Sequence, residues 1–379
     1  MVTNGHHQNN FDLIRLLAAL QVTVGHGLYW LKIVPVDHWI FVTLIRPFPG
    51  VAIFFVVSGF LVTRSYIGGS GRLLPFFCRR ALRIYPALWL QFVFVFVLMA
   101  TTAGFEISAL ADGRFYKWIF FAFILGSDFY ANALTMYSPF QWSGLYKSYP
   151  ADVLWTIPVE LGFYVLTPIV FSQPVARRKL TGLFVFLLFV VSVLVDFLAG
   201  PLLRNYGHLN STGMLASSPA PYFWIFLCGA AVALYWEKVR HMFEGQVIWW
   251  SAFYLIGAAF DHYITGNIDL RFRYPEILTI PRTILLAGVV ISFAYSWKGL
   301  SNWMRGVDLS YGLYLLHLPV IYTFYYCGVT EDLSILFISL AIAIGLAALS
   351  FFGVERRAMR WKPLVEAGAV RVSQLLRLA

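Results

Sequence analysis

The chain has 379 residues, of which 60% are hydrophobic and only 12% are charged. Soluble globular domains carry about 25% charged residues. These figures and a mean hydropathy of +0.72 therefore exclude an ordinary water-soluble enzyme, and they also exclude a disordered chain. Long apolar runs such as residues 181–195 lack the alternation of membrane-barrel strands. The composition predicts an all-α, polytopic membrane protein.

Ten segments are apolar and close to the roughly 20 residues that cross ~30 Å of hydrocarbon. They lie near residues 12–31, 43–66, 83–103, 151–171, 180–200, 220–236, 247–265, 278–297, 309–326 and 333–353. With these spans, 19 of the 28 Lys and Arg residues fall on one side, and 12 of the 18 Asp and Glu residues fall on the other. Basic loops stay in the cytoplasm, so both termini are predicted there, in a multi-pass protein of the inner membrane.

The same asymmetry explains the net charge of +10 without nucleic acid as a partner. The cysteines Cys78, Cys228 and Cys327 have neither a metal-binding spacing nor a disulfide framework. We therefore predict no metal site and no nucleic-acid partner.

An eleventh apolar stretch, residues 118–125, is too short to span. Counting it as a span would also move the basic residues 177–179 to the outside. We interpret residues 104–150 as an outer segment with a re-entrant or interfacial helix around residues 115–130. The chain then divides into a transmembrane domain, residues 1–353, and a basic cytoplasmic tail, residues 354–379, on the inner membrane surface.

Ionisable residues within spans are costly, so each is a functional candidate. Arg15 and His26 in the first span are eleven residues apart, which is about three turns and a rise of ~16 Å on one helix face. Arg15 is thus expected near the inner surface and His26 in the outer half. Glu160 in the fourth span has a comparable depth. We predict that it meets His26 and orients it as a general base, although either residue could instead be a structural partner between helices.

Other polar residues in or near the spans allow two interpretations. Arg79, Arg80 and Arg83 are either an anion clamp or charges that set the topology. Ser58 and Gly59 favour close helix packing. In the ninth span, Tyr311, Tyr314 and His317 follow one another at helical spacing, and His317 is a ligand contact or a packing partner. Arg282 and Asp196, near outer ends of spans, are substrate contacts or snorkelling residues.

Taken together, these segments resemble the acyltransferase-3 family of integral membrane enzymes, which O-acylate extracytoplasmic glycans. The similar segments are the Arg15–His26 helix, residues 54–61 (FFVVSGFL), Arg80-Ala-Leu-Arg83, Trp155-Thr-Ile-Pro-Val-Glu160, residues 310–319 and residues 354–356. The order of these motifs covers nearly the whole chain. Departures are Leu161, where the family often has a second acidic residue, Thr156 in place of Ser, and Pro158. Some relatives append an SGNH-type hydrolase domain, and we expect the stand-alone form here.

The resemblance implies a donor substrate, acyl-CoA with acetyl-CoA as the default, and no tightly bound cofactor. Arg80 and Arg83 would hold the CoA phosphates with help from Arg15. His26 would remove the proton from a sugar hydroxyl that attacks the thioester, with an acyl-histidine intermediate as the less favoured variant. Glu160 would orient His26 or position the acceptor.

The implied acceptor is a glycan or lipid-linked saccharide outside the membrane, such as O-antigen or exopolysaccharide. Candidate substrate contacts are Trp155, Tyr311, Tyr314, His317 and Arg282, with the aromatic residues of 104–150. The alternatives are a secondary transporter of protons or organic anions and a structural scaffold. No inverted repeat supports the first, and the second does not explain polar residues at matched depths. The acceptor and the oligomeric state stay open.

Overall fold

The computed structural model describes residues 9–69, 71–126, 128–140, 145, 150–172, 181–206, 215, 218–266, 278–297, 299–304 and 306–378. In these parts of the chain the fold is all-helical, as predicted. The one extended pairing among them is an isolated antiparallel bridge between Phe105 and Phe140.

The α-helices are α1 (Phe11–Trp30), α2 (Gly50–Gly68), α3 (Leu73–Thr102), α4 (Gly113–Leu125), α5 (Asp128–Thr135), α6 (Thr156–Val170), α8 (Thr181–Tyr206), α10 (Phe223–Leu234), α11 (Trp236–Val239), α12 (Val247–Thr265), α13 (Thr279–Tyr295), α14 (Ser310–Tyr326), α15 (Leu333–Ser350), α16 (Arg356–Arg360) and α17 (Lys362–Leu378). Short 3-10 or π segments are η1 (Phe41–Ile45), η2 (Ile107–Ala111), η3 (Asp152–Trp155), η4 (Ala220–Tyr222), η5 (Arg240–Met242), η6 (Asn302–Met304) and η7 (Phe351–Glu355).

A helix lies at each of the ten predicted spans, but fewer have the length and hydropathy of a membrane span. Within the described residues six qualify: Phe11–Trp30, Phe41–Gly68, Leu73–Thr102, Asp152–Val170, Thr181–Leu198 and Leu333–Val372. A seventh would join Ala220–Leu234 to Trp236–Met242 across a bend of 77°. Because α13 and α14 have only 17 residues each, the count of ten and the orientation of the termini stay predictions.

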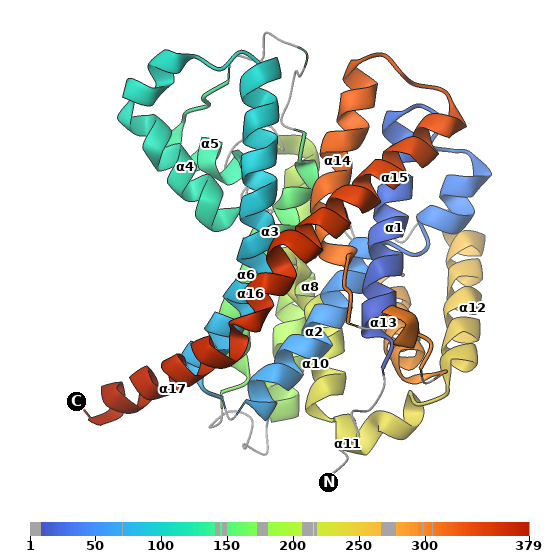
Figure 1. Ribbon diagram of the computed structural model, residues 1–379. Helices are drawn as coiled ribbons and strands as arrows, with labels where there is room; N and C mark the ends of the chain where they lie inside the picture. Colours follow the sequence, from blue (N-terminus) through green and yellow to red (C-terminus); the bar gives the residue numbers. More distant parts are fainter. Residues whose placement is uncertain are drawn as a thin grey trace.

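Helix α2 lies at the centre of the bundle, and among the described elements its contact with α10 is the most extensive (Figure 1). A Cβ atom at Gly59 would lie 2.0 Å from the Phe226 carbonyl oxygen, and one at Gly229 would lie 2.0 Å from that of Val56. Small residues let helix backbones approach in this way. The predicted packing role of the Ser58-Gly59 pair therefore holds for Gly59.

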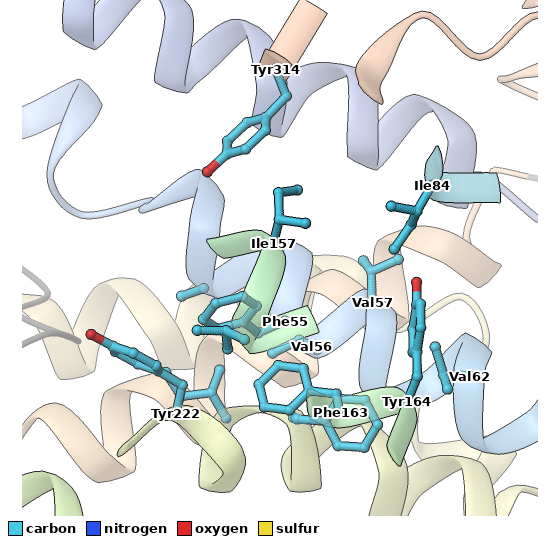
Figure 2. Packing of buried hydrophobic residues seen from close by; sticks show 14 of the residues in the cluster. Phe55, Val56, Val57, Val62, Ile84, Ile157, Phe163, Tyr164, Tyr222 and Tyr314 are labelled. Atoms are coloured by element: carbon cyan, nitrogen blue, oxygen red, sulfur yellow. The ribbon is translucent and has the colours of Figure 1, made fainter. Parts of the chain in front are cut away.

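Aromatic rings fill the space beside this helix pair (Figure 2). The Phe55 ring is 5.2 Å from that of Phe163 and 5.7 Å from that of Tyr222, and the Phe163 ring is 4.7 Å from that of Phe226. Rings in tilted and edge-on contact add attraction beyond their buried area. This core holds α6 and α10 against α2, and so fixes the helices that line the site described below.

The outer segment predicted to be re-entrant contains a pair of short helices. Helix α4 has 13 residues; Asp112 caps its start by accepting a 2.8 Å hydrogen bond from the Arg114 amide, and Gly126 ends it with a φ of 65°. Helix α5 packs against α4, and the indole of Trp118 donates to the Asn132 side chain over 2.7 Å. Neither helix is long enough to span, in keeping with the interpretation of residues 118–125. The depth of this hairpin in a bilayer stays a prediction.

The C-terminal region continues from α15 without a break. Its π-helix η7 spans the predicted domain boundary at residues 353 and 354, and α17 then packs along α3. An ion pair of 3.6 Å joins Arg79 Nη1 to Glu366 Oε1. In Figure 1, α17 ends at the lower end of the bundle, where α1 begins. The division into a domain and a tail stays a prediction.

Candidate active site

A cavity that opens to solvent lies between α1, α2, α3, α6 and α14, and encloses about 820 Å³ when the space at its mouth is included. It is lined by Arg15, Val51, Phe54, Phe55, Val57, Ser58, Leu61, Val62, Arg80, Arg83, Ile84, Thr156, Ile157, Glu160, Tyr164, Ser310, Tyr311 and Tyr314. The lining combines charged residues with apolar and aromatic ones, as is typical of sites for small molecules and cofactors.

One end of the cavity is cationic, because it brings together the three arginines predicted to bind an anion. Arg15 Nη2 lies 2.9 Å from Asp308 Oδ2, and Arg83 Nη2 donates to the same oxygen. The guanidinium of Arg80 lies 5.6 Å from the Tyr164 ring centroid, a cation–π contact. Among the described residues Arg80 has no carboxylate partner, so its charge is available to a ligand.

Asp308 is a site residue that the sequence analysis missed. It is buried, and it accepts a 3.1 Å hydrogen bond from the Ser310 amide in addition to those from the arginines. Burial alone would raise the pKa of Asp308, but the charges of Arg15 and Arg83 and the hydrogen bonds from Ser310 and Arg83 outweigh it. The net effect lowers the pKa well below its ordinary value, so Asp308 is ionised at neutral pH. The only sequence signal is that Asp308 is one of six acidic residues on the predominantly basic side and lies directly before the ninth predicted span.

Glu160 lies in the cavity wall. Its carboxylate accepts a hydrogen bond from the hydroxyl of Tyr164, one helical turn further along α6. The predicted contact between Glu160 and His26 does not form in this structure, because the described partner of His26 is a residue of α14. Thr156, one turn before Glu160, meets Tyr314, and Tyr164, one turn after it, lies against Arg80, so Glu160 lies nearer the arginine end of the cavity than His26 does.

His26 is paired with His317. Their ring planes are nearly parallel, at an angle of 7°, with centroids 5.2 Å apart, and the rings meet edge to edge with His26 Nδ1 2.9 Å from His317 Nε2. His317 Nδ1 lies 3.1 Å from the carbonyl oxygen of Leu313. A carbonyl can only accept, so Nδ1 of His317 carries its proton, and the Nε2 of the neutral ring accepts the Nδ1 proton of His26. This order leaves the lone pair on His26 Nε2.

Tyr314 connects the cavity to this histidine pair. It lines the cavity, and its ring centroid lies 6.1 Å from that of His317. Its hydroxyl is 3.0 Å from Thr156 Oγ1 and donates to the Val153 carbonyl over 3.3 Å. The ring is thereby held beside the Phe54 ring, 5.5 Å away, at the end of the cavity opposite Asp308.

The remaining predicted contacts divide into two groups. Tyr311 lines the cavity. Trp155 instead packs against the Tyr222 ring, 5.2 Å away, and Arg282 forms a buried ion pair with Asp261; neither lines the cavity. Asp196 accepts a 2.9 Å hydrogen bond from the indole of Trp224. The described residues contain no cluster of three His, Cys, Asp or Glu residues suited to a metal ion.

The fold is thus a bundle of membrane helices whose arginine-lined cavity reaches Tyr314, beside the histidine pair. Residues 8–353 match the family model described as an acyltransferase domain. The chain therefore belongs to the acyltransferase-3 family, and it is a multi-pass membrane acyltransferase.

Two relatives illustrate the similarity. The chain is 35% identical over 377 residues to Nodulation protein 10 of Rhizobium leguminosarum bv. viciae, which covers 97% of each chain. It is 26% identical over 325 residues to an O-acetyl transferase of Shigella phage Sf6, with 83% of this chain and 85% of the phage protein covered. No solved structure matches the chain.

Proposed function

We propose that the protein is an inner-membrane O-acyltransferase that moves an acyl group, acetyl by default, from cytoplasmic acyl-CoA to a hydroxyl of a saccharide outside. The observation that carries the proposal is the ordered pair of His26 and His317 beside a cavity whose other end holds three arginines. The name of the phage relative, an O-acetyl transferase, supports oxygen as the accepting atom.

In this proposal the cationic end binds the phosphates of CoA. Guanidinium groups bind phosphate oxygens in a bidentate manner, and Arg80 keeps its charge free of any described carboxylate. Arg15 and Arg83 share Asp308, which holds their side chains in place, and Arg15 also pairs with Asp12. The ~16 Å rise from Arg15 to His26 is on the order of the length of the pantetheine arm. The thioester then approaches the histidines past Tyr314.

The transfer step needs a base but no redox partner. His26 Nε2 takes the proton of the acceptor hydroxyl, and the oxygen attacks the thioester carbonyl carbon. The C–S bond breaks, the new C–O ester bond remains on the saccharide, and the sulfur leaves with the proton as free CoA thiol. Glu160 acts within the cavity in this scheme, where it fixes Tyr164 beneath Arg80.

The test uses the full chain in lipid nanodiscs with labelled acetyl-CoA and isolated cell-envelope glycans. We expect label to reach the glycan with the unaltered protein, and at least a hundredfold less with His26→Ala, the typical contribution of a general base. His262→Ala is the matched control, because His262 is an exposed histidine of α12. Thermal melting establishes that each variant is folded.

Two outcomes contradict the proposal. Unchanged transfer in folded His26→Ala excludes His26 as the base. Absence of both transfer and CoA binding, with solute flux across liposomes that contain the protein, identifies a transporter instead.

A further inference from the structure

The cavity wall holds buried polar atoms that have no hydrogen-bond partner among the described residues. They are Arg15 Nε, Ser58 Oγ, Arg80 Nε and the Tyr311 hydroxyl. A buried polar group left unpaired costs about 1–3 kcal/mol, so nearly all such groups in proteins are paired with protein, water or ligand. Four of them around one cavity indicate a polar guest. Phosphates at the cationic end account for the arginines but not for the two hydroxyls.

Ser58 and Tyr311 belong to the middle of the cavity. On α2, Ser58 lies between Phe54, whose ring contacts Tyr314, and Leu61, about two turns further along the helix. On α14, Tyr311 is one residue from Ser310, which hydrogen-bonds Asp308, and one turn from Tyr314. Both hydroxyls therefore lie between the arginine end and the histidine end.

The orientation of Ser58 follows from its neighbour. Gly59 is pressed against the backbone of α10, so the preceding residue, Ser58, faces about 100° away, into the cavity. Thr63, on the same helix, also has a buried hydroxyl without a described partner, but it does not line the cavity. Ser58 therefore differs from Thr63 because it lines the cavity, although both hydroxyls are buried.

On the basis of the proposed function, we propose that Ser58 and Tyr311 bind the amide groups of the pantetheine arm of the acyl donor. This arm lies between the phosphates and the thioester, the same order in which the arginines, the two hydroxyls and Tyr314 follow along the cavity. A hydroxyl can donate to an amide carbonyl or accept from an amide N–H. The apolar side chains nearby, Val57, Ile84 and Ile157, suit the methylene and methyl groups of the arm.

The test compares two probes that share the arm, acetyl-CoA and S-acetylpantetheine, which lacks the nucleotide. The KM of acetyl-CoA and the inhibition constant of S-acetylpantetheine against it are measured in nanodiscs. Ser58→Ala and Tyr311→Phe should each raise both the KM of acetyl-CoA and the inhibition constant of S-acetylpantetheine about fivefold, since each substitution removes one hydrogen bond. Arg80→Gln should weaken acetyl-CoA only. Thr63→Val is the matched control and should change neither constant.

The inference and the proposed function fail in different ways. If the unaltered protein transfers acetyl from acetyl-CoA but Ser58→Ala and Tyr311→Phe leave both constants unchanged, the hydroxyls do not bind the arm and only the inference is overturned. The inference is also overturned if S-acetylpantetheine does not inhibit, or if both variants raise the KM of acetyl-CoA without changing the inhibition constant of S-acetylpantetheine. Absence of acetyl-CoA binding to the unaltered protein overturns the proposed function itself.

Discussion

Which ring nitrogen of His26 carries the proton depends on His317, a residue 291 positions further along the chain. Leu313 holds the Nδ1 proton of His317, and His317 in turn holds that of His26, so two neutral groups fix the position of the lone pair on His26 Nε2. A carboxylate in that position would instead stabilise the protonated ring. In the proposed function His317 is thus a positioning residue, where the sequence had suggested a contact with substrate or a packing partner.

His317→Ala should lower the acyl-transfer rate by about a hundredfold, because His26 loses the acceptor that sets its tautomer. His317→Gln should recover part of the rate, since an amide oxygen can accept the same proton. Rates are measured with labelled acetyl-CoA in nanodiscs, and the KM of the donor should stay the same. Equal rates for His317→Ala and the unaltered protein would show that the pair does not order the base.

The ion pairs of Asp308 should make a contribution to the stability of the protein that depends on pH in a defined range. Asp308→Asn leaves two arginines without their shared carboxylate and should lower the free energy of unfolding by about 2 kcal/mol at pH 7. This is less than for a fully buried pair, because the arginine side chains are 22% and 25% exposed. Since the pKa of Asp308 is lowered in the folded protein, its contribution is complete above the ordinary value near 3.9 and is lost as the pH falls below it.

Thermal melting at several pH values checks this prediction. The difference in melting temperature between Asp308→Asn and the unaltered protein should be the same at pH 7 and pH 5, and should become smaller only below about pH 4. Asp12→Asn is the control, because Asp12 also pairs with Arg15 but its side chain is 43% exposed, so its loss should matter little. A gap that already narrows at pH 6 would contradict the assignment of a lowered pKa.

At the scale of elements, the contact between α2 and α10 positions the side of the cavity wall that α2 forms. Gly59→Ala places a methyl group against the backbone of α10, and the helices must separate to accept it. We expect a loss of about 1–3 kcal/mol in stability from this overpacking, together with lower transfer activity, since Phe55 and Ser58 move with α2.

The comparison variant is Gly345→Ala on α15, where an added Cβ meets nothing within 4 Å. Melting temperatures of the two variants in the same detergent provide the measurement. If Gly59→Ala and Gly345→Ala have the same melting temperature, the close approach of α2 and α10 is not a source of stability.

At the scale of the whole molecule, the predicted orientation can be tested with a natural cysteine. Cys327 is exposed directly after α14, on the side that the charge asymmetry places outside, whereas Cys78 and Cys228 are partly buried. A membrane-impermeant maleimide should label intact spheroplasts at Cys327, and Cys327→Ser should remove the label. Labelling that requires inside-out vesicles would reverse the topology and place the arginine end of the cavity outside.

The positions of the helices could be predicted because apolar length and charge asymmetry are properties of each segment alone. A helix lies at every predicted span, including α12, α13 and α14, which fall short of a span by length or hydropathy. Arg15, Arg80 and Arg83 could also be grouped, since charge places them at the same end of the bundle. The partner of Glu160 could not be predicted, because apolar length and charge place a residue along its helix only coarsely, and Glu160 lies beside Tyr164 and Arg80 instead of at the level of His26.

By itself, the sequence determined that this is a helical membrane protein of the acyltransferase-3 family and which residue types carry its chemistry, because composition, period and motif are local. Only the tertiary structure decided which of them meet. It paired His26 with His317 and not with Glu160, brought Asp308 between two arginines, and removed Trp155 and Arg282 from the cavity. The physical reason is that a contact depends on which helices are neighbours and how each is turned, and many distant packing contacts set both.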